Sequence, residues 1–229
     1  MKNIAIVLAG GRGSRMESDI PKQYMSLCGK PVLYYALNAF QNSVIDEIII
    51  VSGADDVEHC QKEIVEKYGM TKVSKVVSGG KERYDSVING LRAIEGTDGY
   101  VFIHDGARPC VSEGIIERCL QDVKKHKACV AAVPVKDTIK VVDKERFSVT
   151  TPDRSTLWQI QTPQVFELAL VRQAYEKMYR DEARGNITDD AMVVEKYSDT
   201  RVKMSLGGYN NIKITTPEDM IIAAAMLSE

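Results

Sequence analysis

The hydrophobic pattern of the chain alternates between short apolar runs and longer segments in which apolar residues recur every three or four positions. The apolar runs predict buried strands at residues 4–8, 47–52, 73–77, 100–104 and 129–135. The helical periodicity predicts helices at residues 32–40, 57–68 and 84–94 and after Ser112. This alternation predicts an α/β fold, in which a mostly parallel sheet lies between two layers of helices in a Rossmann-like, three-layer α/β/α arrangement.

The last third of the chain is less regular. It predicts two further helices, at residues 167–179 and from Asp189, and two further strands, at residues 202–206 and 211–214. The final helix has a clear start, because Thr216 can cap it and Pro217 suits its first turn. The sequence contains no internal repeat, low-complexity stretch or linker, so we expect a single domain over residues 1–229.

A hairpin with a polar tip is predicted between residues 136 and 158. Runs with β-like alternation at 138–142 and 147–151 flank the polar residues 143–146. A lone hairpin is only marginally stable in water, so we expect this one to pack against another surface. Residues 136–158 are therefore expected to form a protruding β-arm.

The first apolar run ends in a glycine-rich loop. Gly10, Gly11 and Gly13 have no Cβ atom, so a ligand can approach their backbone closely. Successive backbone N–H groups in such a loop form a concavity for anions, and Arg15 and Lys22 add positive charge nearby. Neither the Walker A string nor the complete G-x-G-x-x-G fingerprint occurs here. The loop therefore predicts a polyphosphate site of a different type.

Several short motifs follow one another along nearly the whole chain. They are LAGGRGSRM at 8–16, PKQY at 21–24, GGKERYDSV at 79–87, HDGARP at 104–109, VKDT at 135–138, QTPQ at 161–164, TDD at 188–190 and NIKITTPED at 211–219. In this order they resemble the motifs of nucleotidyltransferases that join a nucleoside triphosphate to a sugar or polyol phosphate. Within that group the chain is most similar to the family of 2-C-methyl-D-erythritol 4-phosphate cytidylyltransferases, enzymes of non-mevalonate isoprenoid biosynthesis.

The resemblance implies a Mg²⁺-dependent transfer of the CMP moiety of CTP to the polyol phosphate, giving 4-diphosphocytidyl-2-C-methyl-D-erythritol and pyrophosphate. The residues that match the family's basic residues are Arg15, Lys22 and Lys213. Such cations can neutralise the negative charge that builds on the α-phosphate during the reaction. Asp105 matches the position that binds Mg²⁺, which favours one or two carboxylates together with substrate phosphates. From the residues alone, a turn or capping aspartate would be the preferred interpretation of Asp105, and the resemblance reverses that preference.

Two sets of binding residues follow from the same resemblance. The CTP site is expected to use Ala9, Gly10, Gly11, Gly13, Gly79, Arg83, Ser86 and Asp105. The acceptor site is expected to use Arg108, Thr138, Arg154, Thr162 and Thr188. Thr138 and Arg154 belong to the arm, which the resemblance implies hooks a second subunit, so they would complete the neighbour's site in a homodimer. The alternative is an arm that acts as a flap on its own domain.

The composition narrows the range of partners. Hydrophobic residues make up 44% of the chain and charged residues 27%, with a formal net charge of −2. This balance argues against non-specific nucleic-acid binding, and no apolar run reaches the roughly 18 residues of a membrane span. The five cysteines include no C-x-x-C pair, which is typical of reduced thiols. We expect a cytoplasmic enzyme whose partners are CTP and a polyol phosphate, with neither nucleic acid nor membrane.

Two alternative functions stay open at this point. AGG at 9–11 also occurs in the ribitol-5-phosphate cytidylyltransferases, which make CDP-ribitol, whereas HDGARPC at 104–110 is closer to the methylerythritol type. The second alternative is a non-catalytic nucleotide-binding regulatory protein. The presence of the three basic residues together with Asp105 favours catalysis, because a pure binder needs no charges that act on a transition state.

Overall fold

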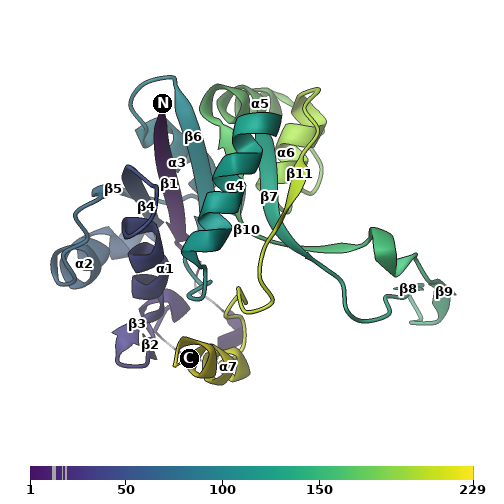
Figure 1. Ribbon diagram of the computed structural model, residues 1–229, viewed down its shortest axis with the longest axis horizontal. Helices are drawn as coiled ribbons and strands as arrows, with labels where there is room; N and C mark the ends of the chain where they lie inside the picture. The colour runs from purple at the N-terminus through teal and green to yellow at the C-terminus, as the bar shows by residue number, and fades with distance from the viewer. Residues whose placement is uncertain (12–13, 17, 19, 229) are drawn as a thin grey trace.

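A seven-stranded sheet forms the centre of the protein (Figure 1). The computed structural model describes residues 1–11, 14–16, 18 and 20–228, and the predicted site residue Gly13 lies outside these ranges. The strands are β1 (Lys2–Ala9), β4 (Glu47–Ser52), β5 (Val73–Ser78), β6 (Gly99–Asp105), β7 (Ala128–Pro134), β10 (Trp158–Glu167) and β11 (Lys203–Leu206). They lie in the order β11-β7-β10-β6-β1-β4-β5. Only β10 runs antiparallel to its neighbours, which confirms the predicted mostly parallel sheet.

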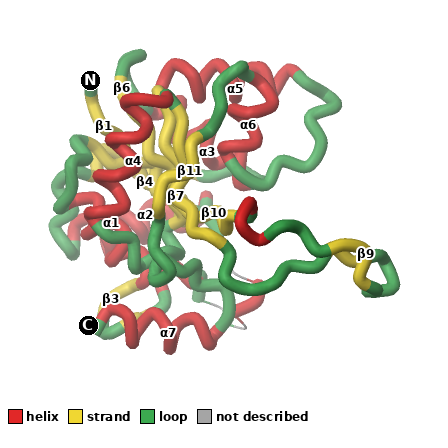
Figure 2. The backbone as a smooth tube through the Cα atoms, turned by 45° about the vertical axis from the view of Figure 1, so that its right-hand side comes forward, coloured by secondary structure: helices red, strands yellow, loops and turns green. Residues whose placement is uncertain are grey.

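Helices cover both faces of this sheet (Figure 2), which confirms the three-layer prediction. One layer contains α1 (Val32–Gln41), α2 (Val57–Cys60) with its π-helical continuation Gln61–Glu66, and α4 (Glu113–His126). The other contains α3 (Arg83–Ala93), α5 (Leu168–Arg180) and α6 (Asp190–Tyr197). Alternate residues of β1 face the two layers, Ala5 and Val7 the first, Ile4 and Ile6 the second. Burial on both faces explains why such a strand is a continuous apolar run.

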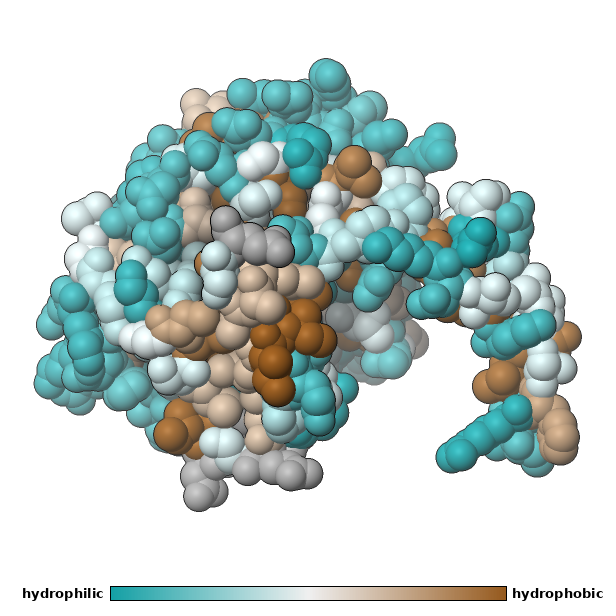
Figure 3. Space-filling model, turned by 60° about the horizontal axis from the view of Figure 1, so that its bottom comes forward, coloured by the Kyte–Doolittle hydropathy of each residue, from teal (hydrophilic) through white to brown (hydrophobic). Residues whose placement is uncertain are grey.

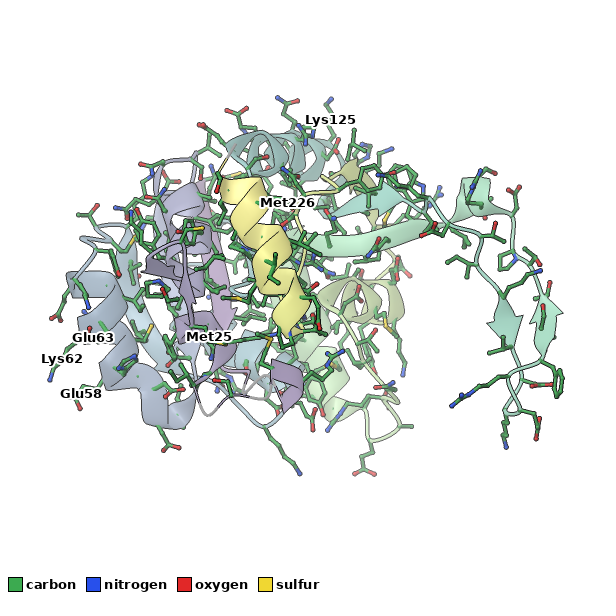
Figure 4. All side chains as sticks on the ribbon, turned by 90° about the horizontal axis from the view of Figure 1, so that it is seen from below. Met25, Glu58, Lys62, Glu63, Lys125 and Met226 are labelled. Carbon is green, nitrogen blue, oxygen red and sulfur yellow. The ribbon has the colours of Figure 1, made fainter. Side chains whose placement is uncertain are left out.

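The last helix, α7 (Pro217–Leu227), lies at the carboxyl edge of the sheet (Figures 1 and 4). Together with the short strands β2 (Ser26–Leu27) and β3 (Lys30–Pro31) it surrounds a small apolar cluster, to which the labelled residues Met25 and Met226 belong. The backbone N–H of Thr216 donates to Asp219 Oδ2 at 2.9 Å, which confirms the predicted start of this helix. None of the described helices combines the length and apolar character that crossing a membrane requires.

Strand β10 was not predicted from the sequence. Its apolar pattern is broken by Pro163 and by the glutamines at 161 and 164. The structure accommodates the proline at a register shift between Ile160 and Gln164, where a strand can do without a ladder hydrogen bond. The strand is central despite its sequence because its residues 164–167 pair with β6 and its two ends pair with β7.

Residues 211–214 are irregular, so the predicted strand there is wrong. The backbone N–H of Ile214 donates to the carbonyl of Ala107 at 2.8 Å, and Asn211 N–H donates to Gly208. This segment is therefore held by the loop that follows β6 rather than by a neighbouring strand. The difference matters because the segment carries Lys213.

The predicted arm leaves the body of the protein and ends in a hairpin of β8 (Val141–Val142) and β9 (Ser148–Thr150) (Figure 1). The tip is closed by Asp143 N–H, which donates to the carbonyl of Phe147 at 3.0 Å. Apolar side chains stand exposed on it (Figure 3), with Phe147 72% and Val149 64% exposed. The arm thus presents apolar surface that its own domain leaves uncovered.

Candidate active site

A cavity of about 250 Å³ opens where β1, β5 and β6 end. These strands run parallel within one part of the sheet, where β4 lies between β1 and β5, and the carboxyl edge of such a sheet is the usual place for a ligand crevice. The predicted site residues that line this cavity are Gly10, Gly11, Lys22, Arg83, Ser86, Asp105 and Lys213. An adjoining hollow shares Gly10 and Gly11 and adds Gly79 and Ser52. The structure therefore assembles the nucleotide side of the predicted site from four separate segments.

The glycine at 79 is required by the close packing of its loop. A Cβ atom there would lie 2.8 Å from Ser86 Oγ and 3.0 Å from the carbonyl oxygen of Ser52. The next residue, Gly80, donates its N–H to Ser86 Oγ at 3.1 Å. Ser86, in the first turn of α3, thus shapes the loop from within. Its hydroxyl already accepts a hydrogen bond from the backbone and is part of the floor of the cavity.

Two neighbouring residues tie the first loop to the rest of the site. Gln23 is buried, and its Nε2 donates to the carbonyl oxygen of Ala9 at 2.5 Å, where β1 ends. Lys22 Nζ donates to the carbonyl oxygen of Ile214 at 2.8 Å. Burial and the nearby cation of Lys213 lower the pKa of Lys22. Lys22 is consequently a partly desolvated cation that faces an anion site.

Arg15 is exposed and lies on the 3₁₀ turn Ser14–Met16. Its charge adds to burial and to Lys213 in lowering the pKa of Lys22. Of the three basic residues predicted for catalysis, Lys213 and Arg15 thus both act electrostatically on Lys22. Arg15 is not among the residues that line the cavity.

Asp105 ends β6 and is surrounded by cations. Lys213 Nζ lies 2.7 Å from Asp105 Oδ2, Arg83 Nε lies 3.3 Å from Oδ1, and Arg108 Nε lies 4.0 Å from Oδ2. Burial opposes the charge on this carboxyl, but Arg83 and Lys213 outweigh it and hold the pKa well below its usual range. The carboxylate is ionised at neutral pH and fixes the positions of its partners.

Arg83 is held from its other side by Asp190. Its Nη1 and Nη2 donate to the two oxygens of Asp190 at 2.9 and 2.8 Å. Asp190 is fully buried at the start of α6, and it also accepts a hydrogen bond from the hydroxyl of Tyr175 at 2.5 Å. Burial opposes the charge on Arg83, but Asp190 and Asp105 raise its pKa above the ordinary value. Arg83 is therefore a fixed part of the cavity wall.

His104 and Thr162 form a directed chain of hydrogen bonds behind Asp105. The N–H of Asp105 donates to Thr162 Oγ1 at 3.1 Å, so the Thr162 hydroxyl can give its own proton to His104 Nδ1 at 3.0 Å. His104 Nε2 then carries a proton and donates to the carbonyl of Arg108 at 3.3 Å. Burial lowers the pKa of His104 to about 4, so the ring is neutral at pH 7. Thr162 is 3% exposed, and its role as an acceptor ligand stays a prediction.

A second hollow, of about 430 Å³, lies beside the first and shares Lys213 with it. Arg108 and Asn211 line it, and Arg108 Nη1 donates to the Asn211 carbonyl at 2.8 Å. Within the described part of the chain, the buried atoms Arg108 Nε and Asn211 Oδ1 have no hydrogen-bond partner. Buried polar atoms without a partner mark a place where a polar ligand can bind.

The remaining predicted acceptor residues lie elsewhere. Thr138 and Arg154 are exposed on the arm, where Arg154 Nη1 donates to the carbonyl of Lys136 at 2.8 Å. Thr188 is exposed before α6, with its hydroxyl 3.0 Å from Met192 Sδ. None of the three lines the hollow next to Arg108. One copy of the chain thus brings together only part of the predicted acceptor site.

The donor set suits one mode of Mg²⁺ binding. Among the residues that the structure describes, no group of three His, Cys, Asp or Glu side chains could hold a metal ion. Asp105, however, is an ionised carboxylate that lines the cavity. Mg²⁺ commonly binds through one carboxylate and substrate phosphates, so the residues fit a metal that arrives with the nucleotide.

Sequence reasoning missed several residues that build the site. They are Gln23, Gln161, Gln164, Asp190 and Asn211, all of which form buried hydrogen bonds. Each lies inside one of the motifs on which the resemblance rests. The motifs were the available signal, but a polar residue in a motif does not by itself reveal which partner it has.

Comparisons with known proteins agree along the whole chain. The family model described as "IspD: 2-C-methyl-D-erythritol 4-phosphate cytidylyltransferase" matches residues 3–229. The enzyme of that name from Lachnospira eligens is 54% identical over 226 residues, covering 98% of this chain and 99% of its own, and that from Lachnoclostridium phytofermentans is 47% identical, covering 100% and 97%. The crystal structure of 4-diphosphocytidyl-2C-methyl-D-erythritol synthase from Anaerococcus prevotii has a TM-score of 0.87 and 37% identity, covering 100% of this chain and 96% of its own.

Proposed function

The chain belongs to the family of 2-C-methyl-D-erythritol 4-phosphate cytidylyltransferases, and from this premise we propose how its residues carry out the reaction. The protein transfers the cytidylyl group of CTP to 2-C-methyl-D-erythritol 4-phosphate in isoprenoid biosynthesis. A phosphate oxygen of the acceptor forms a bond to the α-phosphorus. The bond from that phosphorus to the bridging oxygen breaks, and pyrophosphate leaves with the electron pair.

We propose that Lys213, Lys22 and Arg15 neutralise the charge that develops on the α-phosphate and on the leaving pyrophosphate. Lys213 supports this best, because it lines both hollows and so stands where nucleotide and acceptor meet. Its side chain is 40% exposed, which leaves the ammonium group free to turn from Asp105 toward a phosphate. Cations placed in advance at such a point lower the barrier without reorganising during the reaction.

We propose that CTP lies over the two glycine loops. Gly10 and Gly11 from one loop and Gly79 and Gly80 from the other leave their backbone accessible to the nucleotide. Ala9 ends the strand that presents the first loop, and Ser86 holds the second one in shape. Arg83 forms the wall beside them, because its guanidinium donates to two carboxylates, those of Asp105 and Asp190, which hold it in place.

The proposed cofactor is Mg²⁺ bound by Asp105 together with phosphate oxygens of CTP. A bound Mg²⁺ would supply further positive charge at the phosphates. Arg83 holds the Oδ1 side of Asp105, and the mobile Lys213 holds the Oδ2 side. A phosphate that attracts Lys213 would therefore uncover one oxygen of Asp105 at the cavity.

The acceptor is proposed to bind beside Arg108, with residues of a second subunit completing the site. Arg108, with its unpartnered Nε, supplies a cation for the phosphate of the polyol phosphate, and the unpartnered Asn211 Oδ1 can accept a hydrogen bond from one of its hydroxyl groups. Thr138 and Arg154 of the arm are exposed and do not line this hollow in their own copy. A homodimer in which the arm crosses over would bring them there, and it would also cover Val141 and Phe147.

The observation that carries the proposal is the position of Lys213 between the two hollows. Pyrophosphate release from CTP should be measured with 2-C-methyl-D-erythritol 4-phosphate and, separately, with ribitol 5-phosphate. The methylerythritol acceptor should give pyrophosphate and one equivalent of 4-diphosphocytidyl-2-C-methyl-D-erythritol by mass spectrometry. Release only with ribitol 5-phosphate would reassign the acceptor, and release with neither would favour a nucleotide-binding protein without catalysis.

We propose a cytoplasmic location, because CTP and phosphorylated polyols are cytoplasmic metabolites, and we expect neither nucleic acid nor membrane as a partner. Fractionation of cells that express a tagged chain would check the location. Light scattering after gel filtration would check the dimer, with a monomer mass contradicting it.

A further inference from the structure

The carboxylate of Asp190 belongs to the TDD motif, yet it lines neither of the two hollows. It is fully buried, and a buried carboxylate is costly unless it is paired and hydrogen-bonded. The Asp190 carboxylate accepts hydrogen bonds from Arg83 and Tyr175, and neither bond is needed to cap the helix. The helix is capped by Asp189, which accepts from Met192 N–H at 2.9 Å, so Asp190 has another purpose.

Asp190 begins a row of side chains of alternating charge that ends at Lys213. Both of its oxygens accept from the Arg83 guanidinium, at 2.9 and 2.8 Å. Arg83 Nε donates to Asp105 Oδ1 at 3.3 Å, and Asp105 Oδ2 accepts from Lys213 Nζ at 2.7 Å. The two ends differ in exposure, with the side chain of Asp190 0% exposed and that of Lys213 40% exposed. The buried end is fixed and the exposed end is free to reach substrate.

The buried end is fixed by contacts from two other elements. The hydroxyl of Tyr175 on α5 donates to Asp190 Oδ1 at 2.5 Å. Gln164 on β10 accepts from the N–H of Asp190 at 3.0 Å and from that of Ala191 at 2.9 Å. Tyr175 thus holds the carboxylate itself, and Gln164 holds the backbone that carries it. The planar guanidinium that the carboxylate binds at two points is held in turn.

We propose that Asp190 is a positioning residue that sets the location of the Lys213 ammonium group through Arg83 and Asp105. Because Arg83 occupies the Oδ1 side of Asp105, only Oδ2 is directed to the lysine. Without Asp190, Arg83 would be free to turn, Asp105 would be free to rotate, and Lys213 would start from a range of positions. This inference rests on the proposed role of Lys213 in the cytidylyl transfer.

A double-mutant cycle tests the coupling between the two ends of the row. Turnover at saturating CTP and acceptor should be measured for wild type, Asp190→Asn, Lys213→Ala and the double variant. The amide keeps the shape of Asp190 but turns an NH₂ group toward the guanidinium. We expect Asp190→Asn to lower kcat about 10–100-fold in the wild-type background. In the Lys213→Ala background the same change should alter kcat less than about twofold.

Equal losses in both backgrounds would overturn the proposal, since they would show that Asp190 acts independently of Lys213. Asp122→Asn is the matched control. Asp122, on α4, accepts a hydrogen bond from the hydroxyl of the buried Ser205 at 2.5 Å, and it lines neither hollow. If Asp190→Asn does not fold, Tyr175→Phe removes one hydrogen bond from the same carboxylate and keeps the ring. It should give a smaller loss of kcat with the same dependence on Lys213.

A crystal structure of Asp190→Asn gives a result that does not depend on activity. We expect Lys213 Nζ to move beyond hydrogen-bond distance, about 3.2 Å, from Asp105 Oδ2. An unchanged contact would overturn the proposal even if turnover fell. Wild-type turnover in Lys213→Ala would instead refute the proposed function of the lysine, and the crystallographic result alone would then decide whether Asp190 positions it.

Discussion

Lys213 Nζ and Asp105 Oδ2 are 2.7 Å apart, although the two residues are separated by 108 positions in the chain. One is on the irregular segment before α7, and the other ends β6. The carboxylate is 12% exposed and the lysine side chain 40% exposed. The pair therefore joins a fixed anion to a cation that can leave it when a phosphate binds.

Replacing Lys213 by Ala should lower kcat on the order of 10²–10³-fold, with a much smaller change in CTP affinity. The reason is that charge on the α-phosphate and the pyrophosphate grows during the reaction. Steady-state kinetics at saturating CTP and acceptor, with calorimetry for CTP binding, checks this. Lys125→Ala is the control, since Lys125 is exposed in the last turn of α4 (Figure 4). Near-normal turnover of Lys213→Ala would remove it from the catalytic set.

Asp105→Asn should shift the Mg²⁺ activation curve to higher metal concentration, because an amide is a poorer ligand for a hard cation than a carboxylate. The measurement is initial rate against free Mg²⁺ at fixed CTP. The same change also weakens the contacts to Lys213 and Arg83, so kcat should fall as well. If kcat falls but the midpoint of the Mg²⁺ activation curve does not change, Asp105 acts through its ion pairs and does not bind the metal.

His104 should make the protein less stable in mild acid. Its pKa is about 4 in the folded chain against 6.5 ordinarily, so between these values the unfolded chain binds more protons. The free energy of unfolding should fall by about 3 kcal/mol as pH drops from 6.5 to 4. Urea unfolding over this range, compared with His104→Gln, isolates the contribution. Asp105 contributes only at lower pH, because its folded pKa lies below its ordinary value of 3.8. Parallel curves for the two proteins would contradict the assignment.

Gly80→Ala and Gly11→Ala should distinguish a glycine that is needed for packing from one that is needed for the close approach of CTP. A Cβ on Gly80 would overlap Asp85, whereas a Cβ on Gly11 meets no described atom within 4 Å. We expect Gly80→Ala to lower the free energy of unfolding by about 1–3 kcal/mol. Gly11→Ala should leave stability unchanged and weaken CTP binding. Thermal unfolding with and without CTP tests both, and equal destabilisation of the two variants would count against this explanation.

Arg154→Ala and Arg15→Ala chains should each be weakly active and should complement one another. If the arm crosses to a neighbour, a mixed dimer has one site with both arginines intact. Twofold symmetry pairs each arm with one site, so such dimers should regain at most roughly half of wild-type activity. Co-purification of differently tagged chains must first show subunit exchange. Exchanged dimers that stay inactive would place the arm on its own subunit or exclude Arg154 as an acceptor ligand.

The sequence predicted the layers of this fold well and its irregular parts poorly. Strands such as β1 and β4 are buried on both faces, so their apolar runs are unmistakable. Strand β10 escaped prediction because tertiary hydrogen bonds, such as those from Gln164 to α6, stabilise a polar stretch around Pro163. Residues 211–214 show the opposite error, because their alternation of Ile and polar residues predicted a strand that does not form. The segment is held instead by a hydrogen bond from Ile214 N–H to the carbonyl of Ala107 in a loop.

Site residues on strand ends were predictable, and their supporting partners were not. Asp105 ends an apolar run and Lys22 follows the first glycine loop, so the sequence places both near a carboxyl edge. Lys213 lies on an irregular segment and is matched through the motif at 211–219. Asp190 gives no such signal, because its significance comes from Arg83, 107 positions away. For Thr162 the resemblance predicts contact with the acceptor, and the sequence gives no sign that its hydroxyl also bonds Asp105 and His104. A sequence shows that a hydroxyl is present, and only the fold shows which neighbour uses it.

The strand order has a consequence for the protein as it emerges from the ribosome. β7 is bordered in the sheet by β10 and β11 alone, and both are synthesised after it. The four strands β1, β4, β5 and β6 can pair as soon as residue 105 is available, but β7 must wait until the arm and β10 have been made. Lys213 follows later still, so the nascent chain can form a nearly complete sheet before the lysine of its active site has been added.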